Sequence, residues 1–316
     1  MKRKDIFSVV KLVASVLVIT WFADKVIYFS VTKVSLQVHT GQGVGKLNHY
    51  LTVKDDADLL VFGSSRANHH IDPGKISKNG FNMGMDGQFI GYHSTMIKML
   101  PKKRKQIVLL HLDPDKLFDS LYKGWDVSTL MAKYHQNELI KQEIDKAGKA
   151  SWLNHFFWSL DYTNKVLATL YNYISPKYDY KLYDGYDPLA LNKAQKAMRN
   201  KVLKNTMGES CPDKWQKNEV FIRYLSDIKT FCQENGKELI VFTSPIYRDY
   251  CTIDNKKLRA LLVDLKIPYL DHTNLFYDNS SLDLWKDNKH LSNLGAELFT
   301  EQLASELSEP PNILNE

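Results

Sequence analysis

Hydrophobic residues along the chain form three patterns, and each pattern predicts a different kind of element. An almost continuous apolar run extends from Ile6 to Ala23, with Lys11 as its only charged residue. Short apolar runs, such as "LLVF" at 59–62 and "IVLL" at 107–110, are typical of strands buried on both faces of a sheet. Longer segments with apolar residues three and four apart predict amphipathic helices.

Strands and helices alternate over most of the chain, which predicts an α/β fold. We expect strands within 59–62, 79–91, 106–114, 237–245 and 267–273. We expect helices within 92–100, 218–236, 254–266 and 291–307, the last of them capped by Ser292. Because the two kinds of element alternate, the expected architecture is a three-layer α/β/α fold, with a parallel sheet covered by helices on both faces.

The patterning divides the chain into an anchor, a lead-in and one domain. Residues 1–23 form the anchor, and 24–54 form a lead-in in which "VSLQVH" alternates like a short strand before a glycine-rich turn. The α/β domain covers 55–309, and 310–316 is expected to be a loose tail. Between about 116 and 215 the strand pattern is lost and aromatic residues are frequent, so we interpret this region as a helical insertion or cap.

The apolar run near the N-terminus has the length and the flanks of a membrane anchor. A span needs about 20 apolar residues, and Lys2, Arg3 and Lys4 precede this one. A cleaved signal peptide should show a small-x-small cleavage site, and a helix packed on the domain should have a polar face; the run has neither. We therefore predict an uncleaved, single-pass transmembrane helix in the cell membrane, with the domain on the extracytoplasmic side, periplasmic or extracellular.

Composition argues against several classes of function. The net charge of +6 is spread along the chain and no nucleic-acid-binding signature is present, so we expect no nucleic-acid partner. The cysteines form no CxxC pair and no residues have metal-ligand spacing, so we expect neither a metal site nor a cofactor. Outside the cytoplasm two of Cys211, Cys232 and Cys251 could pair, but the spacing does not say which, and three unpaired thiols are an equal alternative.

Two short motifs near opposite ends of the α/β domain carry candidate chemistry. "GSSR" follows the first buried strand directly, so Ser64 and Ser65 stand where parallel sheets place their sites. A serine needs a base to act as a nucleophile, and the base needs an acid that orients it. Asp287 and His290 stand three residues apart just before the last helix and provide such a pair. The loops that carry the two motifs can meet at the carboxyl edge of the sheet.

This combination resembles the SGNH (GDSL-like) hydrolases and acyltransferases. In that superfamily the nucleophile lies in a Gly-Asp-Ser or Gly-Ser-Ser block after the first strand, and an Asp-x-x-His motif closes the domain. The resemblance implies that Ser65 is the nucleophile and that Asp287 and His290 complete a catalytic triad. It also implies an oxyanion hole built from the amides of Ser65 and Gly87, because Asn82 and Gly87 in "NMGMDG" match the family's second block.

The chain departs from the SGNH pattern after the strand "QIVLLH". The family carries there an Asn whose side chain completes the oxyanion hole, whereas this chain has Asp113 or Asp115 in "HLDPD". An ionised carboxylate would repel an oxyanion, so either another donor serves or the activity is weak or specialised. Arg66, Asn68 and His111 are the nearest candidate donors in sequence.

Four residues close to these motifs are candidates for substrate binding. They are Arg66, Asn68, His69 and His111. His69 and the adjacent His70 follow the serine block, but histidines at such positions are more often ordinary surface or loop residues.

The chain resembles the membrane-tethered branch of the superfamily in three features: the anchor, the Gly-Ser-Ser block and the divergent third block, which is the segment after the strand "QIVLLH". This branch includes the D-alanyl-transfer protein of teichoic acids and the alginate O-acetylation proteins. This resemblance implies a serine acyl esterase or O-acyltransferase that acts on an acylated carbohydrate or envelope polymer, beside a membrane-bound O-acyltransferase. One alternative is a catalytically silent SGNH-like module that binds polysaccharide or scaffolds an acyltransferase. Another is an ordinary α/β-hydrolase, but that fold expects Gly-x-Ser-x-Gly, and Ala67 replaces the last glycine.

Overall fold

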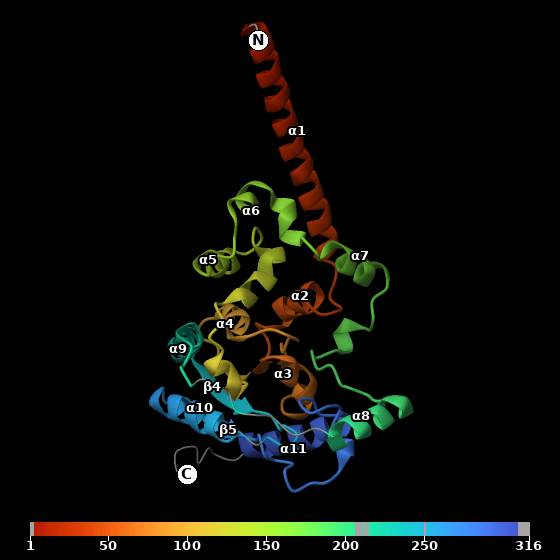
Figure 1. Cartoon of the computed structure of the whole chain (residues 1–316), viewed down its shortest axis with the longest axis vertical. Coiled ribbons are helices and arrows are strands. Elements are labelled where there is room, and N and C mark those ends of the chain that lie inside the picture. Colours follow the sequence, from red (N-terminus) through yellow and green to blue (C-terminus); the bar gives the residue numbers. More distant parts are fainter. Residues whose placement is uncertain (1–2, 206–210, 212–214, 250, 309–316) are drawn as a thin grey trace. The chain divides into compact units, whose positions relative to one another are not determined.

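A computed structural model describes residues 3–205, 211, 215–249 and 251–308 of the chain. The chain divides into two compact units. Unit 1 comprises Met1–Asn48 and Val127–Tyr178, and unit 2 comprises His49–Asp126 and Asp179–Glu316. Figure 1 labels the helices and strands along the chain.

Unit 2 contains a sheet of parallel strands. Among the described residues the strands are β1 (Leu59–Phe62), β2 (Gly80–Asn82), β3 (Gln106–His111), β4 (Lys237–Thr243) and β5 (Tyr269–Asp271). Their order in the sheet is β2-β1-β3-β4-β5, and every neighbouring pair is parallel. The predicted α/β class with a parallel sheet is confirmed, and each strand lies inside a segment that was expected to contain one.

The strand order creates a switch point between β1 and β3. From β1 the chain passes to β2 on one side, and it then crosses to β3 on the other side. Leu60 of β1 therefore lies between Phe81 of β2 and Val108 of β3. In doubly wound sheets, ligands bind in the crevice beyond the carboxyl ends of the strands at such a point. The loops after β1 and β3 thus occupy the favoured position for a site.

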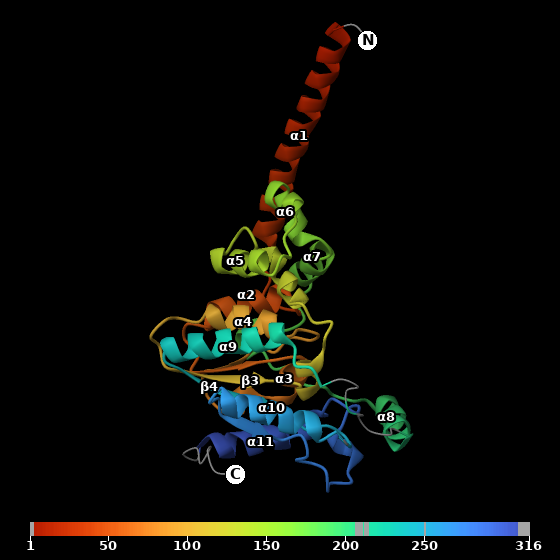
Figure 2. The ribbon, with the colours of Figure 1, turned by 60° about the vertical axis from the view of Figure 1, so that its left-hand side comes forward.

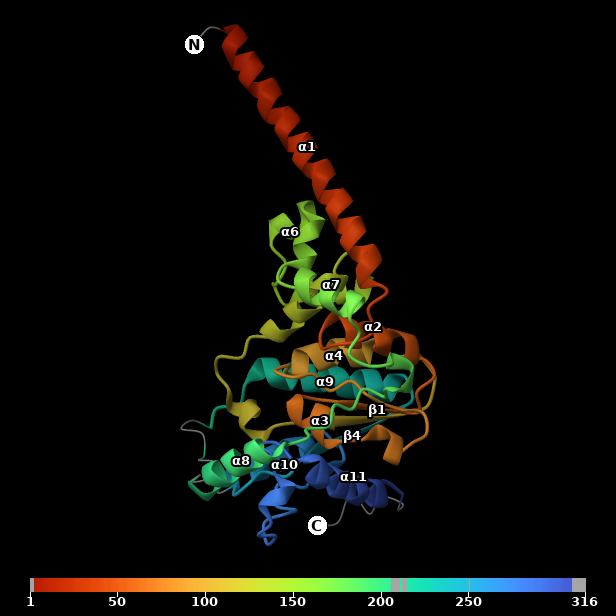
Figure 3. The same cartoon turned by 90° about the vertical axis from the view of Figure 1, so that its right-hand side faces the viewer.

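Helices lie against both faces of this sheet. Four helices of unit 2 that flank the strands are α4 (Ile90–Lys98), α9 (Glu219–Glu234), α10 (Ile253–Asp264) and α11 (Asn293–Ser308). Figures 2 and 3 show α4 and α9 on one face and α10 and α11 on the other. Each of these helices overlaps a segment that was predicted to be helical. Ser292 accepts a hydrogen bond from the amide of Gly295, so the predicted cap of α11 is present.

A core between the sheet and α11 holds the strand ends in place. Its members include Leu59 and Val61 of β1, Leu109 of β3, Phe242 of β4 and Phe299 of α11, each at most 1% exposed. Alternate residues of a strand point to the same face, which is why Leu59 and Val61 enter this core together. Full burial of one such side chain stabilises the fold by about 1.5–3 kcal/mol. The loops that leave these strands therefore start from a rigid base.

Unit 1 begins with the long helix α1 (Arg3–Ser35). Within it, the 31 residues Asp5–Ser35 are long and apolar enough to cross a membrane. None of the most apolar 18-residue window is buried inside the structure. The helix predicted over the apolar run is present, and its length and composition meet the requirements of a membrane span.

The structure corrects the predicted lead-in. The strand expected for "VSLQVH" is not formed, because α1 stays helical to Ser35 and the chain then turns. The helix is prolonged beyond the expected end at residue 23 because Tyr28, which is 3% exposed, packs into the core of unit 1. After the helix, the side-chain amide of Asn48 donates hydrogen bonds to the carbonyl groups of Ser35 and Val38. These carbonyl groups are thereby satisfied without a strand partner. The next helix is α2 (Val44–Val53).

The region between residues 116 and 215 contains helices and no strand in its described part. After η2 (Pro114–Phe118), its helical segments are η3 (Trp125–Lys133), α5 (Glu138–Lys146), α6 (Trp152–Phe156), η4 (Trp158–Tyr162), α7 (Val166–Ile174), η5 (Tyr180–Leu182) and α8 (Lys193–Asn205). The region is not one body, because residues 127–178 group with α1 in unit 1 while its two ends belong to unit 2. Aromatic contacts explain this grouping, since Tyr28 of α1 packs against Trp158 and Tyr162.

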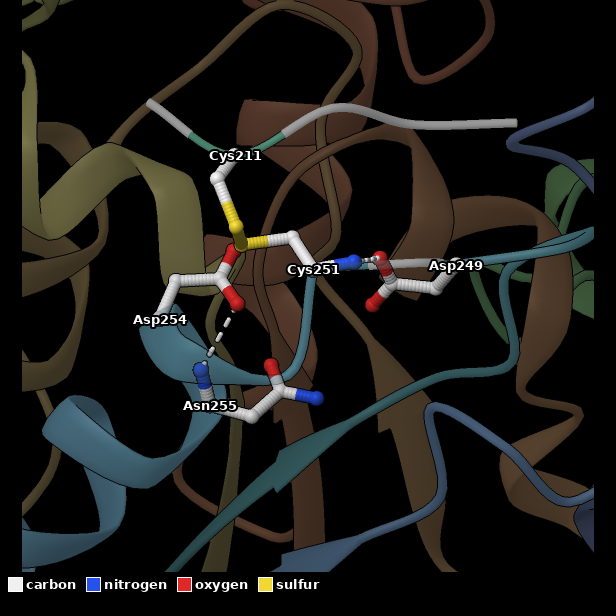
Figure 4. The surroundings of a disulfide bond; sticks show 5 residues. All are labelled: Cys211, Asp249, Cys251, Asp254 and Asn255. Carbon is white, nitrogen blue, oxygen red and sulfur yellow. Dashed lines mark hydrogen bonds between the residues drawn. A yellow bond between two sulfur atoms is a disulfide. The ribbon is translucent and has the colours of Figure 1, made fainter. Parts of the chain in front are cut away.

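Cys211 and Cys251 form a disulfide bond, while Cys232 is buried and unpaired. The bond joins the segment after α8 to the loop after β4 (Figure 4). In that loop the carboxylate of Asp249 accepts a hydrogen bond from the amide of Cys251. The predicted tail, 310–316, lies outside the described residues.

Candidate active site

Gly63 makes the sharp turn between β1 and the short helix α3 (Ser65–His70). Its φ of +144° is a conformation that residues with a side chain rarely adopt. A Cβ atom at this position would lie 2.6 Å from the Cβ of His111 and 2.9 Å from that of Ala67. Only glycine therefore fits, and the turn leaves the next two residues, both serines, at the carboxyl end of β1.

Ser65 and His290 lie within hydrogen-bonding distance, although they are 225 positions apart in the chain. The distance from Ser65 Oγ to His290 Nε2 is 2.8 Å. Both carboxylate oxygens of Asp287 lie 3.0 Å from His290 Nδ1. A carboxylate only accepts hydrogen bonds, so Nδ1 carries the proton and Nε2 is left to accept the serine hydroxyl. The arrangement predicted from the two motifs is present in the structure.

The loop before α11 fixes the orientation of Asp287. An antiparallel bridge between Trp285 and Leu291 closes this loop. Asp287 Oδ1 accepts hydrogen bonds from the amides of Lys289, at 2.9 Å, and His290, at 2.8 Å. Burial raises the pKa of Asp287, but these bonds and the contact with the imidazole outweigh it and lower the pKa to about 2. The carboxylate is therefore ionised at neutral pH and can stabilise an imidazolium at His290.

His70 links the helix of the serine to the loop of the histidine. It is fully buried, and burial holds its pKa well below the usual range, so the ring is neutral. A neutral ring can accept a hydrogen bond, and His70 Nε2 accepts one from the amide of Leu291 at 3.0 Å. Leu291 directly follows His290, so His70 positions the candidate base. The interpretation of His70 as a surface or loop residue is wrong.

Arg199 of α8 supports the same loop from another direction. It is 5% exposed and donates hydrogen bonds to the carbonyl oxygen of Trp285, at 3.0 Å, and to Asp283, at 2.9 Å. Asp283 is therefore already bound, although it stands close to His290 in the sequence. Asp287 is left as the carboxylate that orients the imidazole.

A cavity of about 260 Å³ opens beside Ser65 and His290. Phe89, Ile90 and Phe221 form part of its apolar wall. Charged side chains also line it, including those of Lys116 and Lys289. The cavity thus combines an apolar wall with a few polar groups that converge on the serine, as small-molecule sites commonly do.

Two backbone amides near Ser65 are candidates for an oxyanion hole. The amide of Ser65 belongs to the first turn of α3, where helical N–H groups have no partner inside the helix. Gly87 lines the same cavity in the loop after β2, with a φ of +70° and open space where a Cβ would be. Both predicted amide donors therefore belong to residues of the cavity wall.

Asn82 does not line this cavity. Its side-chain nitrogen donates hydrogen bonds to the carbonyl groups of Ala67, at 2.8 Å, and Ile71, at 2.7 Å. Its side-chain oxygen accepts one from the amide of Gly84, also at 2.8 Å. The residue is fully buried and ties α3 to the start of the loop that carries Gly87. Asn82 thus positions the candidate oxyanion hole and contributes no group to it.

Of the two acidic residues expected after β3, Asp113 is paired with Arg66, and Asp115 is paired with Lys116 at 3.1 Å. Arg66 Nη1 lies 2.6 Å from one carboxylate oxygen of Asp113, and Ser64 Oγ donates a hydrogen bond to the other at 3.0 Å. Burial alone would raise the pKa of Asp113, but the guanidinium beside it holds that pKa far below its usual range. Arg66 also donates to the carbonyl oxygen of Ser244 at 2.7 Å, so its hydrogen bonds are directed inward.

His111 belongs to the same buried network. Its Nε2 lies 3.0 Å from Ser244 Oγ, which also accepts a hydrogen bond from Arg66. Burial lowers the pKa of His111 to about 3, so the ring is neutral at physiological pH. His111 and Arg66 line the cavity, but both side chains have protein partners.

Asn68 and His69 do not line the cavity. Asn68 donates a hydrogen bond to the carboxylate of Asp86 at 2.9 Å. The two ring nitrogens of His69 face the carbonyl oxygen of Asp187, at 2.5 Å, and the carboxylate of Asp86, at 3.2 Å. Although burial opposes it, the contact with Asp86 raises the pKa of His69. These two predicted substrate-binding residues thus have structural partners instead.

Two supporting residues, Arg199 and Ser244, escaped the sequence analysis, and a third, His70, was named there without this role. Ser244 could have been found, because it follows the apolar strand "LIVF" directly and so stands at the same edge of the sheet. The other two act through backbone groups of a distant loop. No local pattern marks such a contact.

Neither protein-family models nor curated proteins match this chain. Within the described residues, no cluster of histidine, cysteine and acidic side chains has an arrangement that could hold a metal ion.

Proposed function

We propose that this chain is a membrane-anchored, SGNH-like serine acyl esterase or O-acyltransferase with a three-layer α/β/α domain. The observation that carries the proposal is the contact of 2.8 Å between Ser65 Oγ and His290 Nε2, with Asp287 on the other ring nitrogen. The contact lies beside a cavity at the carboxyl edge of a parallel sheet, where this fold class binds its ligands.

The proposed reaction begins with attack of Ser65 Oγ on the carbonyl carbon of an ester. His290 Nε2 takes the hydroxyl proton as the C–O bond forms, and Asp287 stabilises the resulting imidazolium. His290 then gives that proton to the leaving alkoxide when the ester bond breaks, which leaves an acyl-serine. Water or a sugar hydroxyl attacks the acyl-serine and loses its proton to His290, which passes that proton to Ser65 Oγ as the acyl–serine bond breaks. The sequence of steps consumes no other reactant.

Charge placement supports an oxyanion hole at the amides of Ser65 and Gly87. Removal of one such donor typically lowers the rate about 10²–10³-fold. The negative charge of Asp113 is offset by Arg66 at 2.6 Å, so it need not repel the oxyanion. The main argument for a silent module is the loss of the Asn that the family carries after this strand, and the pairing weakens only the part of that argument that concerns the charge of Asp113.

The substrate class that we propose is an acylated carbohydrate of the cell envelope. A cavity of about 260 Å³ is slightly below the usual range for drug-sized ligands, which favours a short acyl group. The rim carries charges of both signs, since Lys116 is paired with Asp115 at 3.1 Å and Lys289 also lines the cavity, and such a rim suits a hydroxyl-bearing polymer. A membrane-bound O-acyltransferase, implied by the resemblance to the tethered SGNH branch, is the proposed partner.

The proposed location is the extracytoplasmic side of the cell membrane, with α1 as the anchor. Three basic residues precede its apolar run, which favours an N-terminus on the cytoplasmic side. The disulfide between Cys211 and Cys251 supports an oxidising compartment for unit 2, because such bonds are rare in the cytosol.

Reaction with a fluorophosphonate tests the proposal. We expect the full-length protein in detergent to form a covalent adduct at Ser65, identified by peptide mass spectrometry. Ser65→Ala should abolish the adduct, whereas Ser64→Ala should retain it, because Ser64 faces Asp113. A folded wild-type protein that forms no adduct would favour the silent module, and an adduct at Ser64 would reject our choice of nucleophile.

A further inference from the structure

The end of the apolar run in α1 is tied to a second segment of unit 1. Asp24 and Lys25 are the first charged residues after Lys11 along this helix. The carboxylate of Asp24 accepts hydrogen bonds from the amides of Trp158, at 2.9 Å, and Ser159, at 3.0 Å. These two amides begin η4, one residue after the end of α6, so the carboxyl end of α6 lies close to the level where the apolar run stops.

Lys25 strengthens the same connection. Its Nζ donates a hydrogen bond to the carbonyl oxygen of Phe156, the last residue of α6, at 2.7 Å. The ammonium group also lies 5.5 Å from the ring centre of Trp21 and 4.4 Å from that of Trp158. Such cation–π contacts hold the lysine stem along α1. Backbone and side-chain contacts thus fix α6 beside α1, as Figures 1 and 3 also show.

Three of the five side chains of α6 are apolar and exposed. Trp152 is 74% exposed, Phe156 45% and Leu153 37%, and no residue of this helix is buried. Trp21, on the neighbouring part of α1, is 41% exposed. A short helix in a water-soluble surface would bury such residues or replace them with polar ones. This group of four apolar side chains is therefore only partly covered by the protein itself.

The position of this group along α1 indicates what covers it. The run from Ile6 to Ala23 rises about 27 Å as a helix, close to the roughly 30 Å of hydrocarbon in a bilayer. Asp24 would then stand at the membrane–water boundary. Tryptophan is enriched at this depth, because its ring is apolar and its N–H group is polar. Anything held beside Asp24 would lie at the same depth.

We propose that α6 lies in the interfacial layer of the bilayer and contacts lipid through Trp152, Leu153 and Phe156. The occupant of this apolar face is the lipid bilayer that α1 enters, and the contact requires no protein partner. The inference rests on the proposed function in one respect, namely that α1 spans the membrane. Contact at both α1 and α6 fixes the depth of unit 1 and its rotation about α1, which one helix alone would leave free.

Site-specific fluorophores in lipid nanodiscs test this contact. The full-length chain is labelled with an environment-sensitive dye at one new cysteine, in variants Trp152→Cys, Val16→Cys and Gln142→Cys. The native cysteines interfere little, since two are joined in a disulfide and Cys232 is buried. Gln142 is the matched control, because it is exposed on α5 of the same unit. The nanodiscs contain lipid with brominated acyl chains and no other protein.

We expect quenching by the brominated lipid at residues 16 and 152, with at least about threefold less at residue 142, because interfacial groups lie within reach of the acyl chains. Equal quenching at residues 152 and 142 would overturn the α6 contact. If residue 16 is quenched and 152 is not, α6 waits for a protein partner and our inference fails while the anchor stands. If neither residue is quenched, the proposed anchor fails first. A dye at Leu153→Cys repeats the measurement should the Trp152 variant fold poorly.

Discussion

The edge of the sheet in unit 2 differs from the α6 surface in unit 1. Charged side chains are paired at the sheet edge, whereas apolar side chains are exposed on α6. At the sheet edge, the buried charge of Arg66 and the partly buried charge of Asp113 find each other within the protein, at 2.6 Å. At the α6 surface, large apolar side chains such as Trp152 are left open. The first region is complete in itself and is suited to chemistry. The second is complete only in contact with something else.

Helix α7, also in unit 1, likewise exposes apolar side chains. Leu167, Leu170, Tyr171 and Ile174 follow each other at helical spacing and are between 39% and 83% exposed. The opposite side of this helix contains Thr169, which is 3% exposed. Unit 1 therefore exposes apolar side chains on more than one helix, whereas the charged groups at the edge of the sheet are paired. Unit 2 holds its charged groups in fixed pairs beside the cavity, whereas unit 1 leaves large apolar side chains exposed.

The largest effect should come from removing the serine or the histidine. We expect Ser65→Ala and His290→Ala each to lower kcat for an acyl ester about 10⁴–10⁶-fold, because such residues act as a unit. The double variant should be little worse than either single one. Steady-state hydrolysis of a chromogenic short-chain ester measures this. Trp152→Ser serves as the comparison and should change kcat less than about twofold, since it lies outside the cavity. Additive losses in the double variant would contradict a shared step.

Breaking the buried ion pair should cost the next largest amount. Arg66→Met leaves the Asp113 carboxylate buried without its partner, and we expect the free energy of unfolding to fall by about 3–5 kcal/mol. The double variant Arg66→Met/Asp113→Leu should recover much of this loss. Lys75→Met breaks the exposed ion pair with Glu297 and should cost less than about 1 kcal/mol. Urea denaturation of the full-length protein in detergent compares the variants, and equal losses for the two pairs would reject the comparison.

Loss of the acceptor at His70 should affect turnover more than binding. We expect His70→Leu to lower kcat about 10–100-fold at nearly constant KM, because the amide of Leu291 loses its partner and His290 shifts. His70→Gln offers a new acceptor and should restore part of the rate. Measuring kcat and KM of both variants beside the wild type tests this prediction. Rates that stay at the wild-type level in both variants would show that the bond to Leu291 does not position the base.

His69 should make stability depend on pH in one direction. Its pKa is raised in the folded state, so the protonated form stabilises the fold below the unfolded pKa of about 6.5. That contribution is lost as the pH rises through the folded pKa. We expect the difference in unfolding free energy between wild type and His69→Gln to be larger at pH 6 than at pH 9. A difference that grows with pH would contradict the pairing with Asp86.

The smallest effect should come from Trp152, despite its size. We expect Trp152→Ser to change the free energy of unfolding in detergent by less than about 0.5 kcal/mol, because the ring has few protein contacts to lose. Phe299→Ala, in the core of unit 2, should cost about 3–5 kcal/mol. Thermal or urea denaturation gives both values. A loss at Trp152 as large as that at Phe299 would mean that α6 is covered by protein.

Much of the fold could be predicted because its signals are local. Runs such as 59–62 and 237–243 are continuous and apolar, which is what a strand covered on both faces requires. The error over 34–39 has a local cause as well, since alternation in six residues does not distinguish a strand from a helix end followed by a turn. The packing of Tyr28 into the core of unit 1 is what extends the helix into this segment.

The sequence by itself determined that Ser65, Asp287 and His290 have the residue types and the chain order of a hydrolytic triad. It could not determine the state of Asp113, because the charge on a carboxylate depends on what surrounds it. Only the tertiary structure brought Arg66 to that carboxylate, buried His70 under the loop of the base and paired Cys211 with Cys251. The hydrophobic pattern along a chain indicates which face of a helix or strand is apolar. Pairing between distant polar groups depends on how those faces pack, and no local pattern encodes it.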